Sequence, residues 1–270
     1  MSKKAVVLIG VVLLSATGLV QAQQEQLSGT VDLTYLSSYI WRGFDLYGQS
    51  RSAIQPSINL DLYGTGFGLS IFCSRANGGG RENLEELRYN LNYTNGLYKA
   101  ENYATNYQLG YTYFSYPDMP KKAYNMQEVF ASLSWPKICP AGVVPSYTAI
   151  CSWPSEGKST MANSSGGWLH ILGLGYDMTV SGLTPDIPEQ TFHLSTQLVY
   201  NDGAWDFANP TAGVSKVDHD WSHAVFGVST DFDLGNNLSL TPAIYYQASM
   251  DDSVNKEDET WISMTLRYKF

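Results

Sequence analysis

Two residues of one short segment have side chains that could catalyse hydrolysis. His193 and Ser195 lie two positions apart, and a histidine near a serine can act as the base for a nucleophilic hydroxyl. The apolar neighbours Phe192 and Leu194 alternate with this pair, which therefore lies on the polar face of a predicted strand. A hydrolase acting on lipid would need the pair on the apolar face, so the pattern favours two ordinary residues of a polar face.

The segment 218–223, with the sequence DHDWSH, is a second place where side chains could share a ligand. His219 and His223 would be neighbours in a helix, but in a strand they lie roughly 13 Å apart. A zinc ion needs nitrogen ligands at about 2 Å. A solvated loop is therefore the favoured interpretation, and no metal site is expected.

The three cysteines, Cys73, Cys139 and Cys151, are further side chains that could bind a metal or form a disulfide. An odd number argues against a complete disulfide framework, and the CxxC spacing of many metal sites is missing. Cys73 and Cys151 fall in phase with the apolar faces of their predicted strands, and a Cys139–Cys151 disulfide is left open. We expect no cofactor, no metal and no catalytic residues, hence no enzyme.

Charged residues on the polar faces of predicted strands form a third group. They suit the water-filled lumen of a barrel, where opposed signs in a narrow pore favour small polar or zwitterionic solutes. The candidate lumen-lining residues are Arg42, Asp61, Glu86, Arg88, Glu128 and Asp231.

Alternation of apolar and polar residues along the chain indicates the strands that would position these side chains. About twelve segments show it, each near the roughly 9–11 residues that cross a bilayer at a tilt. The stretch from Trp168 to Tyr176 is apolar on both faces, so its phase is ambiguous. The last segment, WISMTLRYKF, alternates up to Phe270. The predicted fold is all-β, a transmembrane antiparallel β-barrel of about 12 strands.

Connections between the predicted strands alternate in length. The short ones are 63–66, 137–142 and 234–237. The long ones are 43–50, 74–83, 154–167, 201–220 and 249–259. Two connections of middle length, 94–104 and 178–189, do not follow this alternation. Short turns on one side and long loops on the other are typical of an outer-membrane barrel, with both termini on the periplasmic side.

The first 22 residues have the features of a secretory signal peptide. A basic head, MSKK, precedes an apolar run from Ala5 to Val20, and a small-residue cleavage site ends at Ala22. We therefore predict a signal peptide at 1–22, cleaved near Ala22, and a single barrel at 23–270 located in the cell outer membrane.

The composition agrees with export to a membrane. The formal net charge is −9, so the chain is a poor partner for nucleic acid. Charged residues are 15% of the chain, below the roughly 25% of soluble domains, while tyrosine contributes 19 residues and tryptophan 7. These values fit an outer-membrane barrel in contact with lipid and lipopolysaccharide. They fit a secreted carbohydrate-binding β-sandwich less well.

The tryptophans divide by their phase in the predicted strands. Trp41, Trp135 and Trp153 share the lipid face near strand ends, as interfacial girdle residues do. Trp221 and Trp261 are out of phase with the lipid faces of their strands. They stand either at the outer mouth facing the lumen or on the lipid face after a bulge.

Four stretches, in order along nearly all of the predicted barrel, carry a family resemblance. They are SSYIWRGFD (37–45), IQPSINLDLYGTGFGLSIFCS (54–74), YQLGYTYFSYP (107–117) and DWSHAVFGVSTDFDLGNNLSLTPAIYYQ (220–247). Together they resemble the TorF family of porins, also called the Gcw_chp family, and the core at Tyr39, Trp41, Arg42 and Gly43 is the most specific match. The resemblance implies an outer-membrane barrel and a solute channel, with no established substrate.

The leading hypothesis is a narrow passive channel for small polar solutes or ions, because about twelve strands lie between a side-chain-filled barrel and an open porin. One alternative is a lipid-modifying hydrolase in the barrel wall, built on His193 and Ser195. The other is a structural or adhesive barrel with a plugged lumen. By resemblance to outer-membrane proteins, Phe270 would be read by the outer-membrane assembly machinery.

Overall fold

The computed structural model describes residues 26–49, 51–140, 142–156, 166–184, 187–205 and 217–270 of the chain, so the predicted signal peptide lies outside the described residues. The wall strands are β1 (Ser28–Leu36), β4 (Ala53–Asp61), β5 (Phe67–Ala76), β6 (Glu86–Leu97), β7 (Thr105–Ser115), β8 (Met126–Ser134), β9 (Val143–Pro154), β10 (Gly167–Thr184), β11 (Ile187–Asp202), β12 (His219–Thr230), β14 (Leu238–Ser249) and β15 (Glu259–Lys269). The short elements are β2 (Ile40–Trp41), β3 (Phe44–Asp45), α2 (Lys121–Tyr124) and β13 (Phe232–Gly235). In this described part, no helix is long and apolar enough to cross a membrane.

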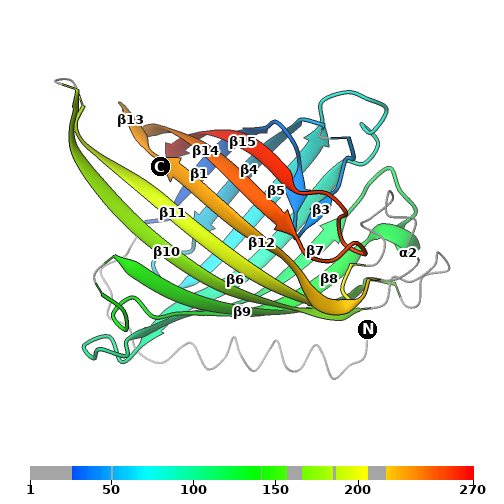
Figure 1. The fold of residues 1–270 in the computed structure, drawn as a ribbon, viewed down its shortest axis with the longest axis horizontal. Helices are drawn as coiled ribbons and strands as arrows, with labels where there is room; N and C mark the ends of the chain where they lie inside the picture. Colours follow the sequence, from blue (N-terminus) through cyan, green and yellow to red (C-terminus); the bar gives the residue numbers. More distant parts are fainter. Residues whose placement is uncertain (1–25, 50, 141, 157–165, 185–186, 206–216) are drawn as a thin grey trace.

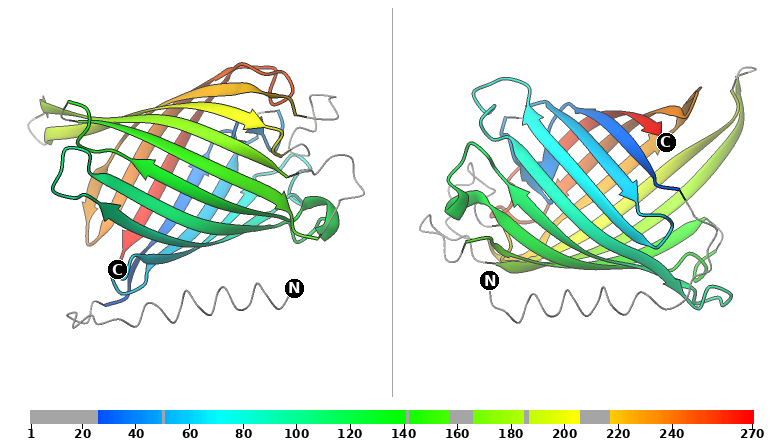
Figure 2. Two further views of the ribbon diagram at one scale, coloured as in Figure 1. Left: turned by 90° about the horizontal axis from the view of Figure 1, so that it is seen from below. Right: turned by 180° about the vertical axis from the view of Figure 1, so that it is seen from behind.

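Every wall strand pairs with two neighbours, so the sheet closes on itself (Figure 1). The last strand, β15, pairs with β1, and beyond this ladder Gly29 and Phe270 exchange two backbone hydrogen bonds of 3.0 Å. The pairing of β12 with β14 removes the last free edge, which closure alone can do. The predicted fold class, a closed antiparallel barrel of twelve strands, is confirmed. Figure 2 shows the same tilted wall from two further directions.

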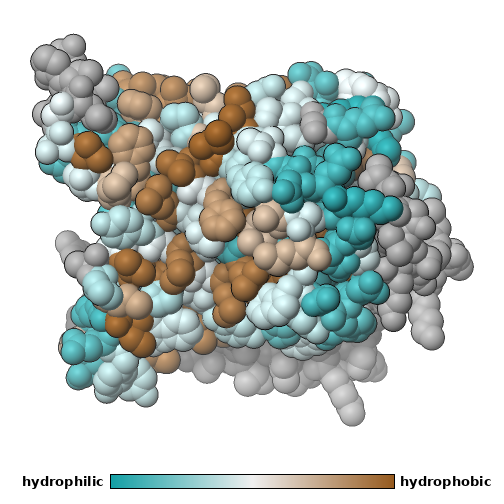
Figure 3. Space-filling model, viewed as in Figure 1, coloured by the Kyte–Doolittle hydropathy of each residue, from teal (hydrophilic) through white to brown (hydrophobic). Residues whose placement is uncertain are grey.

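The outer surface of the wall is apolar because the alternating side chains point outward. Leu33, Leu91 and Ile262 are each about half exposed although they are large and apolar. Figure 3 shows such residues as a brown band over the wall strands, with hydrophilic residues gathered at one end. A patch of this extent is typical of a surface that contacts another apolar phase, as the lipid face of a membrane barrel does.

The two ends of the barrel differ as the connection lengths predict. The connections from β4 to β5, from β6 to β7 and from β8 to β9 lie at the end that carries the C-terminus, and those from β1 to β4, from β7 to β8 and from β14 to β15 lie at the opposite end. The prediction of a middle-length connection at 178–189 is wrong. Strand β10 extends to Thr184 and β11 begins at Ile187, and the two form a long paired ribbon that projects past the neighbouring strands.

The structure shows which side chains face outward in two segments where the sequence pattern was ambiguous, β10 and the start of β12. In β10, Trp168 and Leu172 point outward, whereas Leu169 is fully buried inside. In β12 the register shifts where Val199 pairs with His223 and Tyr200 with Trp221. The extra residue returns Trp221 to the outer surface, where it is 42% exposed, so the bulge interpretation holds for this tryptophan.

The connection after β1 does not extend away from the barrel. Its residues 40–45 form the two-stranded β2–β3 hairpin, which we call the inner hairpin, and its side chains pack against the inside of the wall. Trp41 therefore contacts residues of the lumen, and its predicted place in the lipid-facing girdle is wrong. Trp261 is 8% exposed and also faces the lumen.

Candidate functional site

The turn of the inner hairpin requires glycine at its second position. Trp41 pairs with Phe44, and the two residues between them, Arg42 and Gly43, have φ of 50° and 92°. Both values lie in the left-handed region that two-residue hairpins favour. A Cβ on Gly43 would lie 2.6 Å from Nδ1 of His223, so only glycine allows the turn to approach β12 this closely.

An ion pair fastens this turn to the barrel wall. The guanidinium of Arg42 donates two hydrogen bonds to the carboxylate of Glu128 on β8, at 2.7 and 2.9 Å. The two side chains are 13% and 5% exposed. A bidentate pair of this kind fixes orientation as well as distance. The structure thus places both predicted lumen residues inside the barrel and brings them together.

A second ion pair lies beside the first. Arg88 on β6 contacts Glu86 on the same strand and the hydroxyl of Tyr39, which comes just before the inner hairpin. Glu86 is fully buried. The guanidinium of Arg88 lies 4.5 Å from the ring centre of Trp41, and that of Arg42 lies 4.2 Å from it. Trp41 is therefore held by two cation–π contacts.

Apolar packing fills the same part of the lumen. Trp205 meets the ring of Trp41 edge-on at a centroid distance of 4.6 Å, and Phe114 lies 4.8 Å from Trp205. Phe44 and Val254 are also buried in this cluster. Because these residues come from the wall and from three long-loop connections, the lumen is occupied by packed side chains near the long-loop end.

The other half of the lumen is polar. Arg267 on β15 donates two hydrogen bonds to Asp32 on β1, at 2.8 and 3.0 Å, and Thr34 bonds Thr265 at 2.8 Å. Asp32 and Arg267 were not among the predicted lumen residues, although both alternate with apolar residues of their strands. Amide side chains continue the polar wall across the neighbouring strands.

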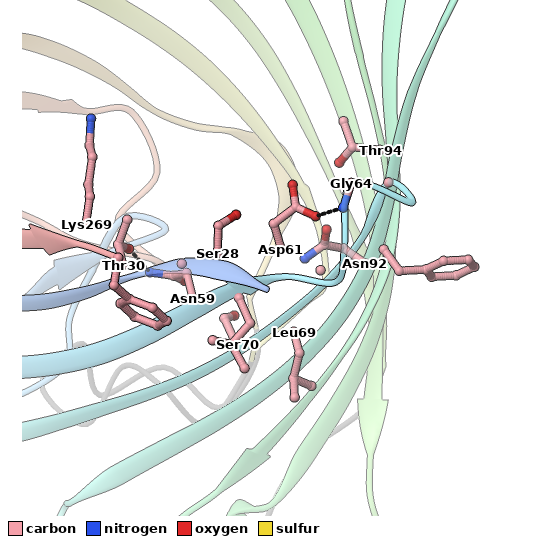
Figure 4. Close-up of a pocket in the computed structure, with 16 residues that line it drawn as sticks. Ser28, Thr30, Asn59, Asp61, Gly64, Leu69, Ser70, Asn92, Thr94 and Lys269 are labelled. Carbon is pink, nitrogen blue, oxygen red and sulfur yellow. Dashed lines mark hydrogen bonds between the residues drawn. The ribbon is translucent and has the colours of Figure 1, made fainter. Parts of the chain in front are cut away.

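The short-turn mouth of the lumen contains a cavity of about 680 Å³ between β1, β4, β5 and β6. Figure 4 shows Thr30, Asn59, Ser70 and Asn92 along its wall, with Asn59 bonded to Thr30. The predicted lumen residue Asp61 is here too and accepts a 2.8 Å hydrogen bond from the backbone N–H of Gly64. This mouth is lined by polar side chains and suits polar solutes.

Asp231 lies with His193 rather than with the inner hairpin. Nδ1 of His193 is 2.7 Å from Asp177, its Nε2 is 3.6 Å from Asp231, and Thr241 donates to Asp231. The pair His193 and Ser195 faces the lumen, as the alternation predicts, and their side chains share no hydrogen bond among the described contacts. This geometry lacks the contact between base and nucleophile that hydrolysis needs.

The other candidate ligand groups are separated. His219 contacts Asp202, whereas His223 is buried and lies 2.9 Å from the hydroxyl of Ser222. Within the described ranges no group of three or more acidic, histidine or cysteine side chains could hold a metal. The three cysteines are free, since Cys139 lies in the turn before β9 and Cys151 near the far end of that strand.

No family model matches the chain, and no curated protein matches it. Among solved structures, the NanC porin has a TM-score of 0.51 at 11% identity, over 90% of this chain and 100% of that chain. The KdgM porin in complex with disordered oligogalacturonate has a TM-score of 0.50 at 10% identity, over 90% and 99%. LpxR from Salmonella typhimurium gives 0.47 at 14% identity, over 89% and 100%. The first two likenesses support the barrel fold, and membership of the TorF family stays a prediction.

Proposed function

We propose that the protein is a narrow passive channel for small polar solutes in the outer membrane, with the inner hairpin as its constriction. The observation that carries the proposal is the contrast along the lumen. One half is lined by polar side chains, and the other is narrowed by a hairpin that the Arg42–Glu128 ion pair fastens to the wall and that Arg88 contacts through the ring of Trp41. The similarity in fold to the NanC and KdgM porins supports this class of function.

The surroundings of the channel follow from the same proposal. The apolar outer band contacts outer-membrane lipid and, in the outer leaflet, lipopolysaccharide. Residues 1–22 direct export and are cleaved near Ala22. Phe270 ends the closing strand and is the residue that the outer-membrane assembly machinery reads. Both termini of the barrel lie on the periplasmic side.

The chemistry of the constriction limits what crosses it. The positive charges of Arg42 and Arg88 are balanced by Glu128 and Glu86, so the constriction has no large net charge. A solute must pass beside the inner hairpin or displace it. Neutral or zwitterionic solutes of small size meet the lowest barrier in such a pore.

Liposome swelling tests the proposal with a size series of neutral solutes. Proteoliposomes containing the folded barrel should swell fastest in the smallest sugar or amino acid, and the rate should fall steeply as the solute grows. Protein-free liposomes and liposomes with heat-unfolded protein are the controls. Swelling no faster than in protein-free liposomes for every solute would overturn the channel proposal.

A structural barrel with a plugged lumen is the second candidate function. Its support is the buried apolar cluster around Phe44 and Trp205, which resembles a protein core more than a water path. The same swelling experiment separates the two candidates, because a plugged barrel gives no permeability even when it is folded. The hydrolase alternative has no comparable support, since His193 and Ser195 face the lumen.

A further inference from the structure

A small cavity lies between the inner hairpin and the wall strands β10, β11, β12, β14 and β15. Its volume is about 290 Å³. Small-molecule sites typically measure ~300–1,000 Å³, so this cavity suits one small ring rather than a chain of them. Its lining includes Trp41, Arg42, Gln197, Tyr245, Gln247 and Trp261.

Two aromatic rings form one side of the cavity. Tyr245 on β14 and Trp261 on β15 are stacked, with ring centres 5.2 Å apart and planes inclined by 19°. Gly227 on β12 pairs with Tyr245, and a Cβ there would lie 2.7 Å from a ring carbon of Tyr245. The glycine therefore lets the tyrosine ring lie close against the wall. An aromatic surface of this kind packs against the C–H face of a sugar ring, because the ring face is electron-rich.

Polar groups without partners adjoin these rings. Gln247 is completely buried, and its Nε2 donates to the carbonyl oxygen of Gly43 at 2.9 Å. Its Oε1 is buried with no hydrogen-bond partner, which is costly unless a ligand or water supplies a donor. Ser195 and Gln197 are exposed to the lumen, and their side chains make no hydrogen bond among the described contacts.

The fixed charge of the lining is already balanced. Arg42 is the one lysine, arginine, aspartate or glutamate among the residues that line the cavity, and its guanidinium is bound bidentately by Glu128. An acidic ligand would have to compete with that carboxylate, and a basic ligand would meet the guanidinium. The lining therefore favours a neutral ligand that offers both donors and acceptors.

We propose that this cavity binds a single neutral sugar ring of hexose size. The sugar ring packs on the outer side of the stacked pair Tyr245 and Trp261, and its hydroxyl groups bond Gln197 and the free oxygen of Gln247. The inference rests on the proposed channel function, because it names the class of solute that pauses at the constriction. Binding is weak, in the millimolar range, since a solute held tightly in a channel does not leave it.

Titration of the detergent-folded full-length barrel with D-glucose tests the site, with intrinsic tryptophan fluorescence as the signal. Trp41 and Trp261 line the cavity, so a saturable change is expected with glucose, and a weaker one or none with D-galacturonate or L-glutamine. Gln197→Leu and Gln247→Leu should each raise the Kd about tenfold. Gln108→Leu is the matched control, because Gln108 bonds Asn92 and Thr94 in the other half of the lumen.

The outcomes separate this inference from the channel proposal. Swelling without saturable glucose binding, tighter binding of galacturonate than of glucose, or an equal loss in Gln108→Leu would each overturn the sugar site while leaving the channel in place. Glucose binding without swelling would retain the site and overturn the channel. Trp261→Phe, which keeps an aromatic ring, should lose the part of the fluorescence change that Trp261 reports but should still bind glucose when binding is measured by saturation-transfer NMR. Loss of the saturation-transfer signal in a variant that still shows heat-modifiable migration would contradict the stacking geometry.

Discussion

Arg42 and Glu128 are the residues that connect the inner hairpin to the wall most directly. The bidentate pair is nearly enclosed, so neither charge can be solvated if its partner is removed. Breaking a buried pair from one side typically costs ~3–5 kcal/mol, whereas replacing both partners by apolar residues of similar volume is close to neutral. The pair therefore makes a prediction about single and double variants.

Glu128→Ala should lower the free energy of unfolding by about 3 kcal/mol or more, because it leaves the Arg42 guanidinium buried without its carboxylate. Urea titration followed by tryptophan fluorescence measures this change through Trp41 and Trp205. The double variant Arg42→Met/Glu128→Leu should recover most of the loss. Asp61→Asn, at the short-turn mouth, is the control. Equal loss in single and double variants would contradict the role assigned to the pair.

Asp258, in the connection 250–258, makes a prediction about pH. The hydroxyl of Tyr246 donates to it at 2.6 Å and the backbone N–H of Ser249 at 2.9 Å, and these bonds lower the pKa of the carboxyl. A lowered folded-state pKa gives stabilisation that is present above the unfolded pKa of about 3.9 and is lost as the pH falls through the folded value.

The measurement is an NMR titration of the Asp258 carboxyl in the folded barrel. Its pKa should lie below the ordinary range of an aspartate, and Tyr246→Phe should raise it toward that range, because the hydroxyl bond is the largest cause of the shift. An unchanged Asp258 pKa in Tyr246→Phe would show that the hydroxyl does not stabilise the carboxylate.

At the scale of elements, the wall strands could be predicted and the inner hairpin could not. Period-2 alternation locates the strands because a lipid-facing surface needs an apolar residue at every second position. The same pattern misplaced Trp41, because a side chain packed in a filled lumen is as apolar as one facing lipid. Gly43 indicates a turn, because glycine readily adopts the positive φ of a two-residue hairpin, but it does not show that the hairpin folds into the lumen.

The closing strand makes a prediction about assembly. Phe270 contributes two backbone hydrogen bonds to Gly29, and its side chain is 45% exposed on the outside of the wall. Phe270→Ala keeps those backbone bonds, so it should change stability in vitro only slightly, but it should lower the folded amount in cells severalfold. Heat-modifiable migration in cell envelopes measures the folded amount. Equal levels in Phe270→Ala and wild type would contradict a role of this residue in assembly.

At the scale of the whole molecule, the charge of the long-loop end should bias permeation. Within the connection 250–258, Asp251 is buried and bonds Ser253, whereas Asp252 and Glu257 are exposed. Exposed acidic groups raise the local concentration of cations over a screening length of about 8–10 Å at physiological salt. The two exposed carboxylates can thus be neutralised without disturbing the fold of the connection.

Wild-type protein should show a mild cation preference that weakens as the salt concentration rises. Asp252→Asn/Glu257→Gln should reduce the preference without changing the conductance by more than about a quarter, since exposed charges away from the constriction steer ions by screened attraction. Reversal potentials in a salt gradient measure it. Asp177→Asn, beside His193 at the short-turn end of the barrel and away from the long loops, is the comparison variant. Anion preference in the wild type would contradict the expected steering.

The barrel fold, the number of strands and their polar inner faces could be predicted from the sequence. Which side chains pack together inside the lumen could not. Of the six predicted lumen residues, Arg42, Glu86, Arg88 and Glu128 gather around the inner hairpin, whereas Asp61 and Asp231 lie apart from it. Which of these charges pair depends on barrel register and on how one connection folds inward. Neither can be derived from alternation along single strands, because both depend on contacts between residues far apart in the chain.

Single-channel recording in planar bilayers tests most directly whether the inner hairpin is the constriction of a channel. The folded wild-type barrel should give a small conductance. A variant with residues 40–45 replaced by glycine and serine should give a conductance severalfold larger, because the lumen loses the side chains that fill it. Heat-modifiable migration confirms that both proteins are folded. No current from either folded protein, or the same conductance from both, would contradict the account.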